Sequence, residues 1–267
     1  MKNQNRYHLL PLLSLFLLLL SGTSGTLSAA TTQNPSQYLN GLAPDIRNAS
    51  LSAKTRELCY DNFVVMHSGI SRTPLWSAEH LTRENIFNAR KLERHNDFHH
   101  EDRLAPGDRA ELKDYARSGF DRGHLAPCAD MPTEQAQEQC FTLANMIPQD
   151  PDNNRHLWEG IEAGLRNLTI KQGELYIISG PLFLGSNLKR LNGRVLVPTH
   201  IFKVVFDPKK NMGAAYLVKN EAGNEWQVIS IGEVEKMAGL NLFPRLSGSV
   251  KQMKLALPGP RERQYPN

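Results

Sequence analysis

The sequence predicts one domain in which β-strands and helices are mixed. Its second half holds four runs rich in β-branched and aromatic residues, at 175–178, 201–206, 214–218 and 226–229, which are typical of strands. They follow a segment, 154–168, whose apolar residues recur every three or four positions, as in an amphipathic helix. Without residues 1–30, 237 of the 267 residues remain (267 less 30). That length can bury one core without disulfide or metal support.

Residues 1–30 have the pattern of a secretory signal peptide. Lys2 and Arg6 precede an apolar run from 9 to 20, and small residues follow up to Ala30. A membrane anchor is the alternative, but a run of about twelve residues is shorter than the ~20 that span a bilayer. No cysteine follows the run closely, which argues against a lipoprotein. We therefore expect a mature N-terminus near Thr31.

The rest of the chain divides by composition. Residues 31–55 are rich in Ser, Asn, Gln, Thr and Pro and are predicted to be a linker or a loosely tied N-terminal arm. Residues 56–257 form the predicted domain, and the Pro-rich segment 258–267 is predicted to be a flexible tail.

Bulk charge carries little information about partners. The net charge of +4 falls to +2 once Lys2 and Arg6 are removed, because residues 1–30 contain no Asp or Glu. Attraction for a polyanion must then come from a local patch.

The remaining elements follow from local signals. Residues 63–67 predict an early strand, Thr133 can cap a helix through about Leu143, and 207–211 predicts a turn between two strands. Residues 145–153 predict a loop, and a short helix over 233–238 should end at Gly239.

The charged segment 78–104 is predicted to be a solvated loop. His95, His99 and His100 suggest zinc, but they lack cysteine partners and a regular ligand spacing.

The cysteines are Cys59, Cys128 and Cys140. Export favours a disulfide, and Cys128 and Cys140 are close enough in sequence to form one. The alternative is that all three are small buried apolar groups. A thiol-protease pair of His124 with Cys128 has no support elsewhere in the chain.

The sequence Asp121-Arg122-Gly123-His124-Leu125-Ala126-Pro127 is the most informative segment. The guanidinium of Arg122 matches phosphate oxygens, and His124 can accept a proton from water near neutral pH. Gly123 allows the backbone a close approach. The alternative is a turn at Gly123 with Asp121 and Arg122 paired at the surface.

The predicted helix carries a second polar cluster, formed by Asn154, Glu162 and Arg166. At about 100° per residue, these side chains lie beside the apolar stripe and can line one wall of a cleft. The stripe consists of Leu157, Ile161, Leu165 and Leu168. The alternative is an ordinary amphipathic helix with Asn154 as N-cap and a Glu162–Arg166 ion pair. Together, the two clusters supply a base, a phosphate-binding group and oxygen ligands, the parts needed for metal-assisted phosphodiester hydrolysis.

The chain resembles the DNA/RNA non-specific endonucleases in three motifs and in their order and spacing. These are the motif at 121–127, the segment Asn145-Met146-Ile147-Pro148-Gln149, and Asn154 with Trp158 and Glu162. That family includes secreted Serratia-type nucleases and mitochondrial endonuclease G. Further matches at 59–61, 180–184 and 197–204 extend the resemblance over roughly residues 57 to 245. It implies an α+β fold with a central, mainly antiparallel β-sheet flanked by helices and a ββα-metal (His-Me finger) active site.

The resemblance also implies roles for single residues. His124 would be the general base, and Asn154 the one direct protein ligand of a hydrated Mg²⁺, for which Mn²⁺ can substitute. Glu162 would act on the metal through water, and Arg122 and Arg166 would contact phosphate.

The family has a further phosphate-binding arginine upstream. Arg94 is the best match, and Arg90 is the alternative because the local sequence diverges. Trp158 is expected to be a packing residue.

The implied function is a secreted or periplasmic endonuclease that cuts DNA and RNA, single- or double-stranded, to 5′-phosphate and 3′-hydroxyl ends. It would have no stable membrane association after signal cleavage, and a homodimer is one option. The alternatives are a nuclease restricted to one sugar type and a catalytically weak nucleic-acid-binding or surface-interaction protein on the same fold. Import into an organelle is a third, although residues 1–30 are not rich in Arg.

Overall fold

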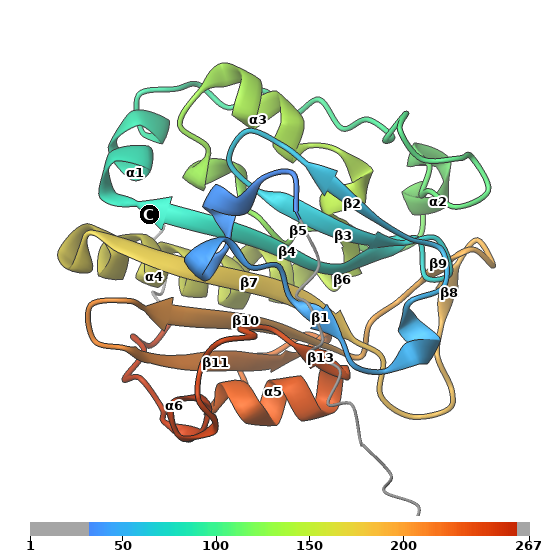
Figure 1. The fold of residues 1–267 in the computed structure, drawn as a ribbon. Coiled ribbons are helices and arrows are strands. Elements are labelled where there is room, and N and C mark those ends of the chain that lie inside the picture. The colour runs from blue at the N-terminus through green and yellow to red at the C-terminus, as the bar shows by residue number, and fades with distance from the viewer. Residues whose placement is uncertain (1–31, 261–267) are drawn as a thin grey trace, which may run out of the picture.

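A seven-stranded antiparallel sheet forms the centre of the computed structural model, which describes residues 32–260 (Figure 1). The spatial order of its strands is β12-β11-β10-β7-β4-β3-β2, and every neighbouring pair is antiparallel. The strands are β2 (Thr55–Cys59), β3 (Val64–Ser68), β4 (Thr73–Thr82), β7 (Glu174–Leu182), β10 (His200–Asp207), β11 (Met212–Lys219) and β12 (Trp226–Ile229). The predicted central antiparallel sheet is confirmed.

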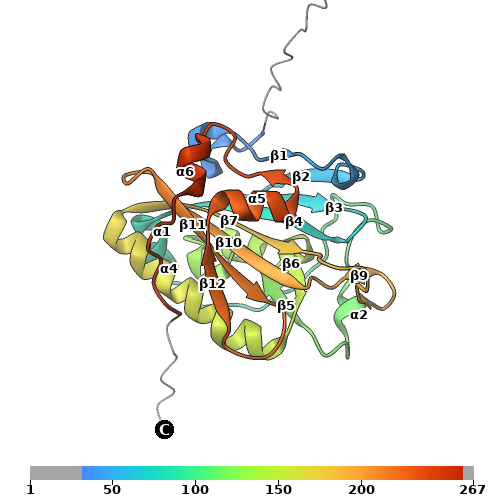
Figure 2. The same ribbon diagram turned by 90° about the horizontal axis from the view of Figure 1, so that it is seen from below.

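Helices cover both faces of the sheet (Figure 2). On one face lie α5 (Ile231–Ala238) and α6 (Gly248–Gln252), and on the other lie α1 (Arg83–Ala89) and α4 (Glu159–Gln172). Because side chains alternate along a strand, β10 sends Phe202 to the α5 face and Ile201 to the α4 face. Lys203 is two residues after Ile201 in β10, so its side chain also points to the α4 face.

The α4 face carries the ββα unit. A two-stranded sheet of β5 (Asp121–His124) and β6 (Met146–Gln149) leads into η6 (Asn153–Trp158), a turn of π-helix, and then α4. The helix predicted over 154–168 is therefore present but longer, and it ends at Gly173, whose φ of 101° breaks the helical path.

Two shorter helices lie beside this unit. Thr133 caps α3 (Glu134–Cys140), as predicted, and its hydroxyl accepts a hydrogen bond from the amide of Ala136. The helix ends at Cys140, slightly before the predicted Leu143. The other is α2 (Leu112–Tyr115). The remaining short elements are η1 (Pro35–Gln37), η2 (Leu39–Gly41), η3 (Ala49–Leu51), η4 (Cys128–Asp130), η5 (Leu143–Asn145), β8 (Arg190–Leu191) and β9 (Val195–Leu196).

The segment predicted to be a linker or arm packs against the domain over its described part. Tyr38 is 3% exposed and belongs to the core on the α5 face. In addition, β1 (Asp45–Ile46) pairs with β13 (Leu240–Asn241). At the other end, the hydroxyl of Tyr216 donates to the carbonyl of Pro258, the first residue of the predicted tail.

The predicted signal peptide and most of the predicted tail lie outside the described residues. Within residues 32–260 no helix has the length and apolar character needed to cross a bilayer.

Candidate active site

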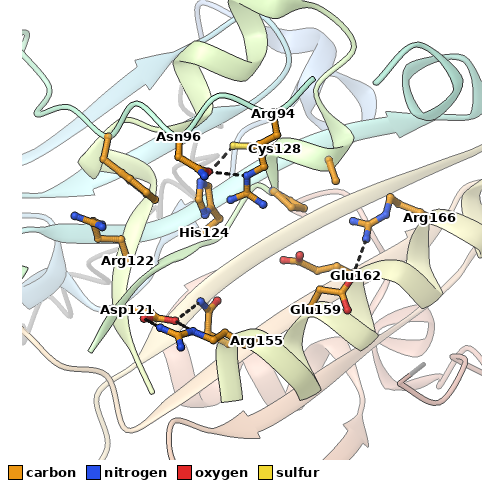
Figure 3. Close-up of a pocket in the computed structure, with 14 residues that line it drawn as sticks. Arg94, Asn96, Asp121, Arg122, His124, Cys128, Arg155, Glu159, Glu162 and Arg166 are labelled. Carbon is orange, nitrogen blue, oxygen red and sulfur yellow. Dashed lines mark hydrogen bonds and ion pairs between the residues drawn. The ribbon is translucent and has the colours of Figure 1, made fainter. Parts of the chain in front are cut away.

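One cleft of about 830 Å³ gathers the polar residues that the sequence singles out (Figure 3). Its walls come from the loop after α1, from β5 and the turn that follows, and from the helix η6–α4. The lining includes Arg94, Arg122, His124, Asn154, Glu162 and Arg166. Arg90 instead caps the C-terminus of α1, is exposed, and is absent from this lining.

His124 ends β5 with its ring packed against protein. Its ring centroid lies 5.7 Å from that of Phe98 and 5.3 Å from that of Phe141, and its Nε2 lies 3.3 Å from the Sγ of Cys128. Burial, reinforced by the positive charges of Arg94 and Arg122, lowers the pKa of His124 to about 3. The imidazole is therefore neutral at neutral pH and able to accept a proton.

Gly123 is a strand residue, so the alternative of a turn at this position is wrong. It pairs with Ile147 of β6, and a Cβ at Gly123 would lie 2.6 Å from the Cβ of Gln149. The absence of a side chain lets β5 and β6 meet closely, and this fixes the direction in which the next residue, His124, leaves the strand.

Asn154 is held by Asp121 rather than acting as a helix cap. Its Nδ2 donates to Asp121 Oδ2 at 3.0 Å, so its carbonyl oxygen is the end of the amide left for another partner. Arg155 grips the same carboxylate through Nε at 2.8 Å and Nη2 at 2.7 Å. Burial alone would raise the pKa of Asp121, but the hydrogen bonds from Arg155 and Asn154 bring it below its usual value.

The predicted alternative pairing of Asp121 with Arg122 is likewise not formed. The guanidinium of Arg122 instead lies over the ring of Phe98, 4.1 Å from its centroid, within the cleft wall.

Glu162 presents an unsatisfied carboxylate. Its Oε1 is buried without a hydrogen-bond partner and lies 3.7 Å from the Nζ of Lys203. Burial raises the pKa of Glu162 to about 7, although Lys203 and Arg166 oppose the shift. A buried acceptor with no donor is costly. The same side chain lines the cleft, where the waters of a hydrated cation could donate to the carboxyl group.

The two remaining arginines are anchored at the edges of the cleft. Arg166 approaches Asp130 at 3.3 Å and Glu159 at 3.9 Å, so its ion pairs differ from the predicted i,i+4 alternative with Glu162. Arg94 donates from Nε to the Oδ1 of Asn96 at 2.9 Å. These contacts hold two guanidinium groups in the wall of the cleft.

Lys203 is a site-supporting residue that the sequence did not single out. It is 1% exposed, and its Nζ donates to the carbonyl of Leu125 at 3.0 Å and to Ser179 Oγ at 2.9 Å. The same ammonium faces Glu162 and the ring of Trp158, whose burial confirms the predicted packing role. One buried cation thus links the backbone after His124 to the carboxylate on α4. The sequence feature that could have indicated this role is a lysine at an inward-facing position of an otherwise apolar strand, β10.

We expect Lys203→Met to lower the free energy of unfolding by about 3–5 kcal/mol, the usual cost of leaving a buried charge without its partner. Glu162 and Asp130 would lose a neighbouring cation, and the Leu125 carbonyl would lose its donor. Urea unfolding measures the change. The matched control is Lys219→Met, whose ammonium pairs at 3.4 Å with Glu221, and because both side chains are exposed the loss should cost below about 1 kcal/mol. Equal losses in the two variants would contradict the assigned role.

The cysteine question is decided by the structure: Cys128 and Cys140 are joined in a disulfide, and Cys59 is free. The zinc alternative for His95, His99 and His100 gains no support. His100 contacts Asp102 and Glu111, and His99 contacts the carbonyl of Asp97.

Comparisons with known proteins agree with this geometry. The sequence profile of the DNA/RNA non-specific endonucleases matches residues 45–249. The chain belongs to this family. It is accordingly a metal-dependent endonuclease, and its resemblance to these enzymes extends from the motifs to the fold.

Three relatives show how far the similarity reaches. Nuclease C1 of Cunninghamella echinulata var. echinulata is 35% identical over 71% of this chain and 83% of its own length. The mitochondrial nuclease of Saccharomyces cerevisiae is 34% identical, with 72% of this chain and 67% of its own length covered. Human mitochondrial nuclease EXOG is 31% identical over 72% of this chain, which spans 58% of that longer protein.

A solved structure supports the same assignment. EndoG, in its complex with EndoGI, superposes with a TM-score of 0.68 at 27% identity, covering 75% of this chain and 92% of that one. The ββα unit of this family is therefore the frame that holds His124 and Asn154.

Proposed function

We propose that this chain is a Mg²⁺-dependent endonuclease that cuts both DNA and RNA and leaves 5′-phosphate and 3′-hydroxyl ends. The observation that carries the proposal is the content of one cleft: a neutral histidine, an amide and a carboxylate with free oxygen atoms, and arginines at its edges. This set supplies proton removal, cation binding and phosphate binding together.

His124 is the proposed general base. Because its Nε2 faces the sulfur of Cys128, Nδ1 is the nitrogen left to take the proton of the attacking water. Its lowered pKa keeps the ring neutral, so the base is ready without a prior deprotonation step.

Asn154 and Glu162 are the proposed cation-holding residues, the first directly and the second through water. One neutral ligand with several waters suits Mg²⁺, which gives up its hydration shell reluctantly, and Mn²⁺ can substitute. The bound cation would stabilise the charge that builds on the phosphate and on the departing 3′ oxygen. The position of Glu162 in the wall of the same cleft as Asn154 supports this assignment.

Arg94, Arg122 and Arg166 are the proposed phosphate-binding residues. Each contributes a guanidinium to the cleft, and planar N–H donors match phosphate oxygens. Contacts of this kind do not read base edges, so we propose little preference for sequence or sugar. Association into a homodimer stays a prediction.

Digestion of plasmid DNA and of RNA, each with and without EDTA, tests the function. Both substrates should be cut with Mg²⁺ and left intact in excess chelator. End-labelling should find 5′-phosphates. Cleavage of only one polymer would replace the proposal with a sugar-restricted nuclease, and cleavage of neither would favour a binding protein on this fold.

The affinity for nucleic acid should fall steeply as the salt concentration rises. If phosphate contacts dominate, the logarithm of affinity falls linearly with the logarithm of salt concentration, by about 0.9 per phosphate contacted on duplex DNA. Binding to several duplexes of different sequence would be measured at rising NaCl. Affinity concentrated on one sequence and insensitive to salt would contradict the proposal.

Export of the chain is part of the proposal. The motive is the signal pattern of residues 1–30, whereas two of the relatives above are named as mitochondrial. N-terminal sequencing of the natively produced protein should start near Thr31. An intact Met1 on membrane-bound protein would contradict export.

A further inference from the structure

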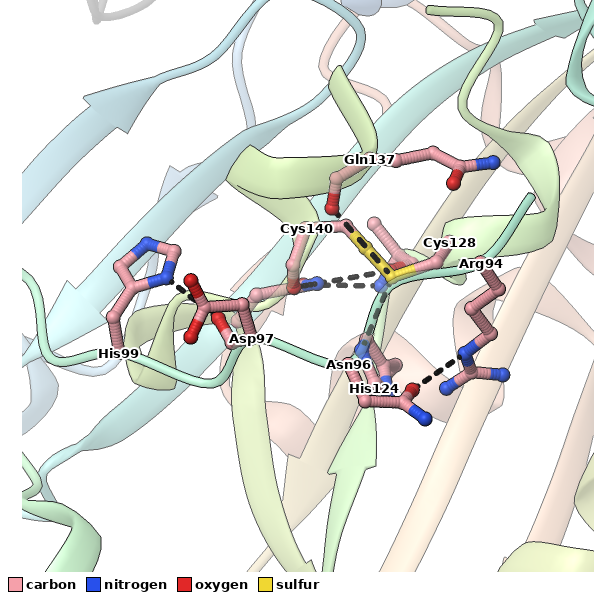
Figure 4. The surroundings of a disulfide bond; sticks show 10 residues. Arg94, Asn96, Asp97, His99, His124, Cys128, Gln137 and Cys140 are labelled. Carbon is pink, nitrogen blue, oxygen red and sulfur yellow. Dashed lines mark hydrogen bonds between the residues drawn. A yellow bond between two sulfur atoms is a disulfide. The ribbon is translucent and has the colours of Figure 1, made fainter. Parts of the chain in front are cut away.

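The disulfide lies directly behind the proposed base (Figure 4). Cys128, in η4, and Cys140, the last residue of α3, meet His124 at the end of β5. The Nε2 of His124 is 3.3 Å from Cys128 Sγ, and the ligand atoms of the three residues all lie within 4.8 Å of one another. Within residues 32–260, this is the one cluster of His, Cys, Asp or Glu side chains close enough to share an ion.

We propose that the reduced form of this protein binds a thiophilic divalent metal such as Zn²⁺ through Cys128, Cys140 and His124, and that the bound metal inhibits the nuclease. The inhibitory half of the proposal rests on the proposed role of His124 as base. The metal-binding half does not.

The spacing suits such an ion. Zn²⁺ binds sulfur at about 2.3 Å and imidazole nitrogen at about 2.0–2.1 Å in a tetrahedron, so sulfur and nitrogen ligands stand roughly 3.5 Å apart. The nitrogen and one sulfur are already at 3.3 Å. The two cysteine Cα atoms are 5.6 Å apart, so small side-chain rotations can separate the sulfurs after reduction. Cys128 lines the cleft, from which a water can supply the fourth ligand.

The local charge selects against a hard cation at this position. Arg94 lies over the ring of Phe141 and Arg122 over the ring of Phe98, the two rings that pack against His124, so a bare cation would be repelled. Two thiolates neutralise a divalent ion, and neighbouring guanidinium groups favour the thiolate form. Mg²⁺ prefers oxygen ligands, whereas thiolates select softer ions. The two metals would therefore occupy different sites.

Inhibition follows from the tautomer of the imidazole. A metal on Nε2 forces the ring proton of neutral His124 onto Nδ1. Nδ1 is then a donor and cannot accept the proton of water. The metal thus disables the base without touching Asn154 or Glu162.

A phosphine can reduce the Cys128–Cys140 disulfide to two thiols. The phosphine takes the oxygen of one water and becomes a phosphine oxide, the S–S bond breaks, and the two sulfurs receive the two protons of that water. Metal binding then releases both thiol protons. In an exported chain the bound metal would keep the protein inactive until a disulfide of another molecule oxidises the site: that disulfide takes up two electrons and two protons to become two thiols, the Cys128–Cys140 bond forms, and the metal ion leaves.

The binding test uses Co²⁺, whose thiolate complexes absorb through sulfur-to-metal charge transfer. Because Cys128 and Cys140 are buried, the full mature chain would be folded and purified in a phosphine. Thiol titration should then find all three cysteines reduced. The phosphine would then be removed and Co²⁺ added. We expect a thiolate band in the reduced protein and none in the oxidised protein. Cys59→Ser, the matched control, should keep the band.

Variants assign the ligands. Removing both thiols in Cys128→Ala/Cys140→Ala should abolish the band, and His124→Ala should weaken Co²⁺ binding by about tenfold or more. Should the double variant fail to fold, Cys128→Ala alone tests the same ligand pair. A reduced protein without a thiolate band, or a band that survives the loss of both thiols, would overturn the proposal.

The activity arm is separate. With saturating Mg²⁺, added Zn²⁺ should inhibit the reduced protein at least about tenfold more strongly than the oxidised one, each compared with its own rate without Zn²⁺. Equal inhibition would place Zn²⁺ at the Mg²⁺ site and overturn the inhibitory half. If the protein proves not to be a nuclease, the Co²⁺ spectra still decide whether the metal site exists.

Discussion

Replacing His124 with alanine should slow phosphodiester hydrolysis by about 10²–10⁴-fold, the usual contribution of a general base. The reason is specific to this cleft: His124 is the neutral imidazole that lines it, and Asn154, not His124, is the proposed direct cation ligand. Single-turnover rates on duplex DNA and on RNA measure the loss. Binding of Mg²⁺ at the proposed Asn154 site should change little in the same variant.

His95→Ala is the matched control, because His95 is exposed and lies outside this cleft. Its rate should stay within a few-fold of the wild type. Melting temperatures of both variants separate chemistry from folding. A folded His124→Ala protein that cuts as fast as the control would end the proposed mechanism, whereas a large loss of stability with a small loss of rate would make His124 a structural residue.

The pH dependence gives a second readout of the same residue. The pKa of His124 is about 3 in the folded chain and near 6.5 in an unfolded one. As pH falls below about 6.5 the unfolded chain gains a proton that the folded chain does not, so His124 costs stability progressively down to about pH 3. The stability gap between wild type and His124→Ala should therefore narrow between pH 7 and pH 4. For the same reason, the rate should not fall through an ordinary histidine pKa near 6.5.

The sequence was sufficient to predict which residues lie together in the cleft where they are close in the chain. Gly123 and His124 are adjacent, and Asn154 and Glu162 share one helix, so a local pattern could place each pair. The strands were equally accessible, because β10 and β11 carry long β-branched runs with a clear turn between them.

The partners of these residues were not accessible from local pattern. Asp121 meets Arg155 across 34 positions, and Arg166 meets Asp130 across 36. Such pairs form only when β5 and η4 pack against the continuous helix η6–α4. The local alternatives, a Glu162–Arg166 pair and an Asn154 cap, therefore looked equally reasonable. Tertiary packing also decided the disulfide, since the loop between the cysteines could have followed other paths.

The N-terminal segment shows how composition can mislead. Its many polar residues predicted a loosely tied arm, yet Tyr38 and Ala43 are almost fully buried in the core on the α5 face. A few apolar anchors suffice when an existing sheet and helix offer them a surface. Lys203 shows the converse, because a charged residue in an apolar strand is stabilised by partners that only the folded chain brings near.

Replacing Asn154 with alanine should remove most of the activity while the fold is retained. The change deletes the proposed direct ligand of the cation, and because loss of even second-shell groups costs metal sites about 10–100-fold, we expect a fall of about a hundredfold or more. The local structure should persist, since Arg155 still holds Asp121 through two hydrogen bonds. Calorimetric titration with Mn²⁺ and cleavage at rising Mg²⁺ measure the two effects, and excess chelator should abolish wild-type activity.

Two further variants separate ligand loss from helix damage. Asn167→Ala is the matched control, because Asn167 lies on the same helix and its amide bonds only a backbone carbonyl of α4. It should leave rate and Mn²⁺ affinity near wild type. Asn154→Asp keeps an oxygen ligand but loses the N–H that Asp121 accepts and sets two carboxylates close together. Its rate should therefore fall between those of wild type and Asn154→Ala, with Mn²⁺ binding partly retained. Full cleavage by Asn154→Ala, or undiminished wild-type cleavage in excess chelator, would remove the cation from the proposed chemistry. A low rate in Asn154→Asp together with wild-type Mn²⁺ affinity would instead make the Asp121 contact, rather than the oxygen ligand, the property that the reaction requires.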